Sequence, residues 1–211
     1  MSETCVRIAL ADEVAFLDPV LARAGSAFSL VGHSYGAAVA LIAALQHPQR
    51  VRALVLYEPT LFSLIEADGP SPNEADGIRN AVAAAAAALD AGDKPLAAQC
   101  FIDYWMGPGS WDATPPERQP AISNSTANVR RWAHALMTEP TPLSAFASLD
   151  VPVLLMTGAR STASAHGVAR RLMSVLPRAE HVVFEQLGHM GPITHPEPVN
   201  EAIAVFLQRH T

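Results

Sequence analysis

The sequence predicts an α/β fold, in which a mostly parallel sheet is flanked by helices and interrupted by a helical lid. Three observations carry this prediction. Short apolar stretches of strand length alternate with longer stretches of helical periodicity, which is typical of a parallel sheet covered on both faces. One long segment in the middle of the chain has no strand pattern. The 211 residues, half of them hydrophobic, suffice for one core with a small lid.

The first predicted element is a helix over residues 9–24, where apolar residues recur at helical spacing. Gly25 follows as a stop signal, and Pro19 predicts a kink or weak point inside the helix. The next elements are a short buried strand over residues 28–31, a helix over residues 37–46 and a second buried strand over residues 51–56.

The last third of the chain repeats the alternation. It predicts strands over residues 153–156 and 181–184, and helices over residues 165–176 and 199–208. Between the two halves, residues 61–149 contain an alanine-rich helical stretch, aromatic residues and proline-rich turns, and they are too many for a loop. We therefore expect residues 1–60 and 150–211 to form the core and residues 61–149 to form a helical cap.

One motif carries chemistry. Gly32-His33-Ser34-Tyr35-Gly36 matches G-x-S-x-G, and it lies between a predicted strand and a predicted helix. In that context the motif predicts a nucleophile elbow, a tight turn that exposes the Ser34 hydroxyl above the sheet. Glycines on both flanks avoid clashes with the neighbouring strand and helix. The N–H groups that open the helix would favour an anion there, and we assign the oxyanion contact to the backbone of Tyr35.

Serine needs a base, and the expected order along the chain is serine, acid, histidine. His189 follows the last predicted strand in the loop Gly188-His189-Met190-Gly191 and is the predicted base. His195 is the alternative, although it lies nearer the start of the final helix.

These features resemble the α/β-hydrolase superfamily. The resemblance runs from about Leu10 to the final helix, and its marks are LVGHSYG, VRALVLYEP, VPVLLMTG and LGHMGPITHPEPVNEAI. In most of the family the acid follows the third of these strands as G-x-x-D, but here that stretch is Gly158-Ala159-Arg160-Ser161. Some members take the acid from the end of the strand after the elbow, which implies Glu58. The alternative acids are Glu139 and Asp150, and a further possibility is that the chain has no acid. In that last case Glu58 would be a carboxylate that caps the entry to the lid.

The same resemblance implies further strands before the elbow, and these are missing from the predicted elements. The N-terminal part of the sheet would then be absent. Only the Tyr35 N–H would remain as an oxyanion donor, and residues 28–31 would form an exposed apolar edge that could pair with a second copy in a homodimer. We expect a shortened form of a longer protein; completion of the sheet by a partner and degeneracy are the alternatives.

The predicted function is that of a serine hydrolase, carboxylesterase-like, that cleaves small and mostly apolar esters or related acyl compounds through Ser34, His189 and Glu58. The aromatic residues of the cap would line an apolar pocket or simply pack in its core. The alternative function is a catalytically impaired protein that binds a ligand or a partner. The residues expected to shape the substrate pocket are His33, Leu61, Phe62, Trp105 and Met190.

Other classes of protein are disfavoured. The net charge of −6 argues against a nucleic-acid partner, and no apolar run is long enough for a membrane span. No glycine-rich phosphate loop or metal-ligand cluster occurs, so no cofactor or metal is expected. Cys5 and Cys100 are far apart and are expected to be reduced thiols in a cytoplasmic protein without a secretory leader.

Overall fold

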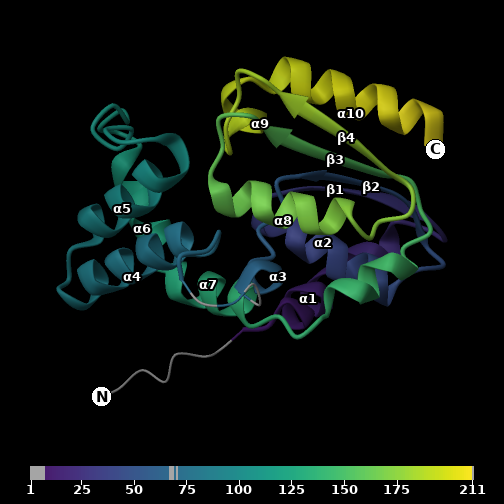
Figure 1. Cartoon of the computed structure of the whole chain (residues 1–211), viewed down its shortest axis with the longest axis horizontal. Coiled ribbons are helices and arrows are strands. Elements are labelled where there is room, and N and C mark those ends of the chain that lie inside the picture. The colour runs from purple at the N-terminus through teal and green to yellow at the C-terminus, as the bar shows by residue number, and fades with distance from the viewer. Residues whose placement is uncertain (1–7, 67–68, 70, 211) are drawn as a thin grey trace.

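The fold is a four-stranded parallel sheet with helices on both faces and a cluster of helices at one end (Figure 1). The computed structural model describes residues 8–66, 69 and 71–210, so Cys5 lies outside the described residues. The strands follow one another in the order of the sequence. They are β1 (Phe28–His33), β2 (Val51–Tyr57), β3 (Val153–Gly158) and β4 (Ala179–Phe184). The predicted α/β class is confirmed.

Two layers of helices cover the sheet. On one face lie α1, α2 and α8, and on the other lies α10, as Figure 1 shows. The predicted helix at residues 9–24 is α1, and it continues through Pro19. The short α9 precedes α10. The bounds are α1 (Leu10–Arg23), α2 (Tyr35–Gln46), α8 (Ala163–Met173), α9 (Gly191–Thr194) and α10 (Pro196–His210).

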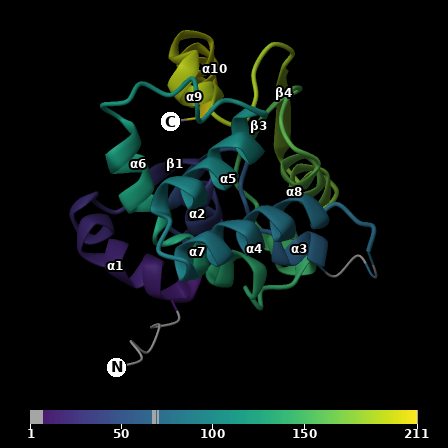
Figure 2. The same cartoon turned by 90° about the vertical axis from the view of Figure 1, so that its left-hand side faces the viewer.

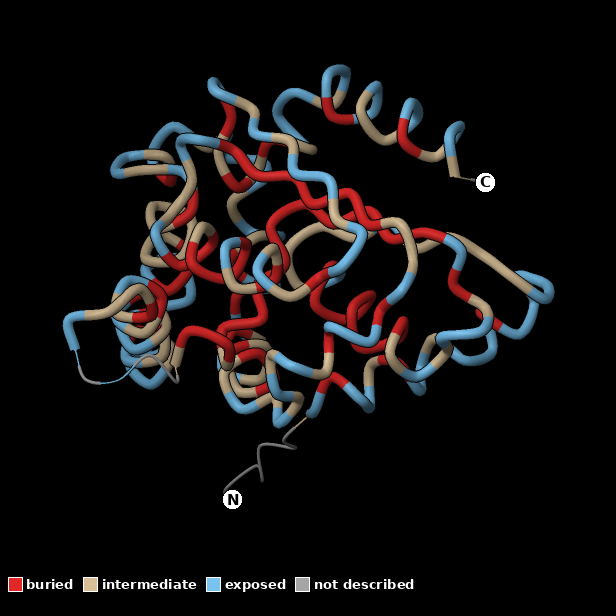
Figure 3. The backbone as a smooth tube through the Cα atoms, turned by 45° about the vertical axis from the view of Figure 1, so that its right-hand side comes forward, coloured by how far each residue is buried: buried red, intermediate tan, exposed pale blue. Residues whose placement is uncertain are grey.

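The central strands are buried on both faces. All residues of β2 except Arg52, and all residues of β3, are buried, which explains their nearly continuous apolar sequences. Figure 3 shows this buried centre, with α10 buried only on the side that faces the sheet. Val199 and Phe206 form that inner side of α10 and pack against β2 and β3.

The helical insert lies at the carboxyl ends of the strands, and Figure 2 views it from that end. Its described residues contain no strand. We call α3 to α7 the cap: α3 (Ser63–Glu66), α4 (Asp76–Asp90), α5 (Lys94–Met106), α6 (Gln119–Thr126) and α7 (Val129–Met137). The 3₁₀ helix η1 (Leu143–Ser148) belongs instead to the core layer, because Phe146 is fully buried in the cluster formed with α2 and α8.

The strand that bears the serine motif is at the edge of the sheet. Among the described residues, β1 pairs only with β2. Val31 is 55% exposed on it, which gives the sheet an apolar edge as expected from the sequence. Within the described part of the chain, no helix is both long and apolar enough to cross a membrane.

Candidate active site

The serine motif forms a strained turn between β1 and α2. Ser34 has φ 56° and ψ −122°, in the left-handed half of backbone space that residues with a side chain rarely adopt. Gly32 is needed because a Cβ there would lie 2.6 Å from the Ala37 Cα. Gly36 is different, because a Cβ there would meet nothing within 4 Å. The expected steric role of both flanking glycines is therefore correct for Gly32 and wrong for Gly36.

Ser34 is joined to His189 and Glu58 by two hydrogen bonds. The Ser34 Oγ lies 2.9 Å from His189 Nε2, and His189 Nδ1 lies 2.7 Å from Glu58 Oε2. The three residues come from the ends of β1 and β2 and from the loop after β4. A carboxylate can only accept, so Nδ1 carries the proton and Nε2 is free to accept the proton of the serine hydroxyl.

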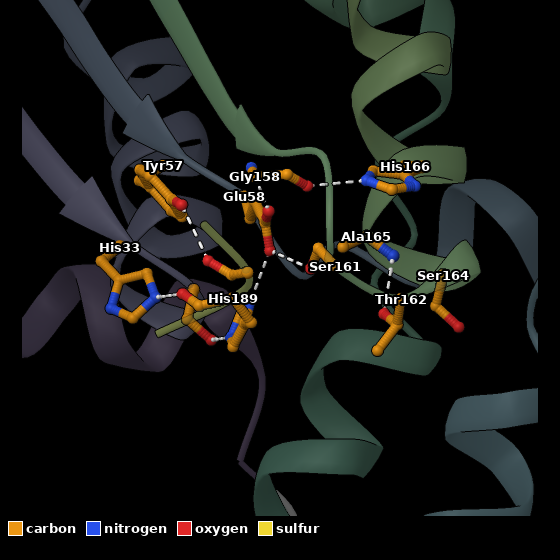
Figure 4. A network of polar contacts seen from close by, with 12 residues as sticks. His33, Tyr57, Glu58, Gly158, Ser161, Thr162, Ser164, Ala165, His166 and His189 are labelled. Atoms are coloured by element: carbon orange, nitrogen blue, oxygen red, sulfur yellow. Dashed lines mark hydrogen bonds and ion pairs between the residues drawn. The ribbon is translucent and has the colours of Figure 1, made fainter. Parts of the chain in front are cut away.

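Glu58 is a fully buried carboxylate with three hydrogen-bond donors. Besides His189, the Gly158 N–H donates to its Oε1 at 2.7 Å and the Ser161 hydroxyl donates to its Oε2 at 2.6 Å. Figure 4 shows Glu58 between His189 and Ser161. Burial acts to raise the pKa of Glu58, but the bond and charge of His189, followed by the bonds from Ser161 and Gly158, outweigh burial and lower that pKa.

The loop that carries His189 is fastened through two of its backbone carbonyls. The Tyr57 hydroxyl donates to Gly188 O at 2.8 Å, and His33 Nε2–H donates to His189 O at 2.8 Å (Figure 4). Gly191 packs against the Tyr57 hydroxyl so closely that a Cβ there would lie 2.3 Å away. Residues at the ends of β1 and β2 therefore hold both the serine and the loop of the histidine.

His33 makes stability depend on pH. Burial, and then the charge of His189, lower the pKa of His33 from 6.5 to about 4, although the bond to the His189 carbonyl opposes this. Between pH 6.5 and 4, His33 is therefore mostly protonated in the unfolded chain and mostly neutral in the folded chain. The stabilisation is complete above pH 6.5 and is lost as pH falls toward 4.

We predict that His33→Gln reduces the loss of unfolding free energy between pH 7 and 4.5 by at most about 3 kcal/mol. Glutamine keeps an N–H for the His189 carbonyl but does not titrate. Urea denaturation of both proteins at several pH values measures this difference. Parallel pH dependences in the two proteins would show that His33 is not held neutral.

An apolar cavity of about 260 Å³ opens beside Ser34, between the core and the cap. Of the expected pocket residues, Phe62 and Trp105 line it, as do Phe101 and Trp132, two further aromatic residues of the predicted cap. Met190 lies instead in a neighbouring polar pocket. Leu61 is fully buried in the core cluster, and His33 binds the His189 loop. The other lining residues are Tyr35, Thr60, Ile78, Val82, Val129, Ala133 and Leu136.

The start of α2 presents backbone donors to the same cavity. The amides of Ala37 and Ala38 bind the Ser34 carbonyl, whereas Tyr35 and Gly36 occupy the first two helical positions, whose N–H groups have no partner inside a helix. The Tyr35 hydroxyl donates to Glu13 Oε1 at 3.0 Å.

The residues considered as alternatives for the base and the acid are not part of the hydrogen-bonded chain of Ser34, His189 and Glu58. His195 is exposed, and its ring lies within hydrogen-bond distance of the neighbouring Thr194 hydroxyl. Glu139 binds Thr141, and Asp150 is an exposed residue at a turn, near Arg178. In residues 8–66, 69 and 71–210, no group of three or more His, Cys, Asp or Glu side chains is arranged to hold a metal ion.

Two contributors to the site were missed at the level of sequence. Ser161 stands where the usual acid of the family pattern would stand, and it binds Glu58 rather than replacing it. Tyr57 directly precedes Glu58 at a strand end, which was the available signal for a role at this edge of the sheet.

Comparisons with known proteins agree with the fold. A sequence model described as the alpha/beta hydrolase fold matches residues 10–196. An alpha/beta hydrolase from Sphaerobacter thermophilus DSM 20745 is 24% identical with a TM-score of 0.65, over 95% of this chain and 75% of that chain.

Two other solved structures are similar. An esterase from Exiguobacterium antarcticum is 18% identical with a TM-score of 0.74, over 95% of this chain and 74% of that chain. The alpha/beta hydrolase enzyme MGS-M2, from a Medee basin deep-sea metagenome library, is 17% identical with a TM-score of 0.77, over 100% of this chain and 75% of that chain. At these identities the likeness shows the fold alone.

Proposed function

Because the chain belongs to the α/β-hydrolase family, we propose that it is a serine hydrolase acting on small, mostly apolar esters or related acyl compounds. The observation that carries the proposal is the hydrogen-bonded chain from Ser34 through His189 to Glu58. It joins a hydroxyl, an imidazole and a carboxylate in the order that acyl transfer requires.

The reaction would begin with attack of the Ser34 Oγ on the substrate carbonyl carbon while His189 Nε2 takes the hydroxyl proton. The oxyanion that forms would accept a hydrogen bond from the Tyr35 N–H. When the tetrahedral intermediate collapses, His189 returns the proton to the leaving alcohol, and the acyl group stays on Ser34. Water, deprotonated by His189, then releases the acid and restores the hydroxyl. Glu58 keeps the imidazole in the tautomer that both steps need.

The cavity supports an apolar acyl group. Seven of its twelve lining residues have aliphatic or aromatic hydrocarbon side chains, and the other five are Ser34, Tyr35, Thr60, Trp105 and Trp132. A space of about 260 Å³ is at the small end for a ligand site, which favours a short acyl chain. No charged side chain lines this cavity among the described residues. The proposed substrate is therefore neutral on its acyl side.

A fluorophosphonate probe tests the proposal, because it phosphonylates only an activated serine. We expect stoichiometric labelling of the folded protein on Ser34, no labelling of Ser34→Ala, and slow hydrolysis of p-nitrophenyl acetate and butyrate. Ser161→Ala is the matched control, and it is expected to keep the label because Gly158 still holds Glu58. Folded wild-type protein that neither labels nor hydrolyses these esters would contradict the proposal and favour a binding protein.

A further inference from the structure

A tryptophan of the cap lies flat on the imidazole of His189. The ring centroids of Trp105 and His189 are 3.8 Å apart, and the ring planes differ by 23°. Both residues are buried, with Trp105 8% and His189 3% exposed. The pair joins α5 of the cap to the loop after β4, segments that are far apart in the sequence.

The indole is fixed from several sides. The ring of Phe62 stacks near it, and the rings of Phe101 and Tyr104 meet it edge-on at centroid distances of 6.2 and 4.8 Å. The Tyr104 hydroxyl in turn donates to Ser164 Oγ on α8 at 2.8 Å. The position of Trp105 is therefore set by the docking of the cap on the core.

Trp105 also lies between the apolar cavity and the neighbouring polar pocket. On one side is the apolar cavity that Ser34 lines, and on the other is a more polar pocket of about 190 Å³ that His189 and Arg160 line. Among the described residues, Trp105 alone lines both of these hollows. Removing the indole would join them and uncover the face of the imidazole on which the indole lies.

The indole contacts a part of His189 that its hydrogen bonds do not. Glu58 and Ser34 bind the two nitrogen atoms at the edge of the ring. The indole packs flat on the face of the ring and restrains it from a further direction. An aromatic face also attracts a cation, so it favours the imidazolium that forms when His189 takes the serine proton.

We propose that Trp105 is a positioning residue through which the docked cap holds the imidazole of His189 in line with Ser34 and covers one face of its ring. The expected effect of Trp105 on kcat rests on the proposed function. The burial of His189 beneath Trp105 can be tested whether or not the protein is a hydrolase. An enzyme of this design would lose its aligned base whenever the cap moves away from the core.

The titratable and charged groups around His189 are known from every element that packs on it. They are His33 from β1, Tyr57 and Glu58 at the end of β2 and Arg160 from the loop after β3, while Tyr104 of α5 packs on Trp105. None of them is changed in the variants that follow, so a change in the behaviour of His189 reports on the indole.

The kinetic test compares Trp105→Phe, Trp105→Leu and Trp132→Leu, with p-nitrophenyl butyrate as substrate. Trp132 lines the same cavity, but its ring contacts Tyr35 and not His189. Trp105→Leu is expected to lower kcat by roughly three- to thirtyfold, from loss of the cation–π contact, while Trp105→Phe restores most of it. The same exchange at Trp132 is expected to change KM more than kcat. If both positions change KM equally and neither changes kcat, Trp105 only lines the cavity and does not position His189, which would overturn the proposal.

A second measurement does not depend on activity. Diethyl pyrocarbonate modifies accessible histidine, and peptide mapping can compare His189 with the exposed His195 in the same sample. We expect His189 to react at least tenfold faster in Trp105→Leu than in wild type, and to stay slow in Trp132→Leu. An unchanged rate in folded Trp105→Leu would overturn the proposal, whereas a wild type without esterase activity would overturn only the proposed function.

Discussion

Replacing His189 with glutamine is expected to lower kcat for p-nitrophenyl acetate by roughly 10⁶-fold, because the base and the nucleophile of such a chain act as a unit. The imidazole is the base to which the Ser34 hydroxyl is bonded at 2.9 Å, so the variant loses the acceptor for the serine proton. Glutamine fills much of the same space, and Glu58 keeps its bonds from Gly158 and Ser161. The loss should therefore appear in the rate and not in the fold.

His195→Gln is the matched control for this prediction. His195 is the other histidine that follows the last strand, and it is exposed and away from Ser34. Steady-state hydrolysis of the same ester, with circular dichroism to verify folding, separates the two variants. A loss of less than about tenfold in His189→Gln, or similar losses in both variants, would mean that the base lies elsewhere.

Glu58→Gln is expected to lower kcat by about 10⁴-fold, as happens when an amide replaces the carboxylate of a serine–histidine–acid chain. The amide can offer its NH₂ to His189 Nδ1, which places the proton on Nε2, where it blocks the transfer from Ser34. Gly158 can still donate to the amide oxygen at the Oε1 position, and the Ser161 hydroxyl can accept from the second N–H of the NH₂ at the Oε2 position, so the side chain stays anchored. We expect a melting temperature close to that of the wild type at pH 7.

The comparison for Glu58 is Glu139→Gln, since Glu139 is a carboxylate of the insert that accepts hydrogen bonds from the amide and hydroxyl of Thr141. Its kcat is expected to stay within twofold of the wild type. A wild-type rate in Glu58→Gln would remove this carboxylate from the mechanism. A large fall in melting temperature together with the lost rate would instead give Glu58 a mainly structural role.

The layered fold could be predicted because its signals are local. Alternating strand and helix patterns lie within single segments, and the structure confirms all four predicted strands. The carboxyl ends of β1 and β3 were predicted less accurately. The strand predicted over residues 28–31 continues to His33, and the one predicted over 153–156 continues to Gly158. The last residues of both strands are polar or glycine, so they interrupt the apolar pattern from which a buried strand is predicted.

Ser34, Glu58 and His189 could be proposed from sequence because the carboxyl ends of parallel strands share one edge of the sheet. The stack of Trp105 on His189 could not, because it depends on how the cap docks on the core, which no local pattern encodes. The same reason explains why η1 was expected in the cap. Its Phe146 is buried against α2 and α8, a contact that only the folded chain makes.

The most direct measurement is a crystal structure of the protein after reaction with an alkyl fluorophosphonate. We expect a covalent bond between phosphorus and the Ser34 Oγ, with a phosphonyl oxygen within about 3 Å of the Tyr35 N–H. The alkyl chain should lie in the apolar cavity beside Phe62 and Trp132, with His189 still between Ser34 and Glu58. Phosphorus attached to any other side chain, or an unreacted Ser34 in folded protein, would contradict the account.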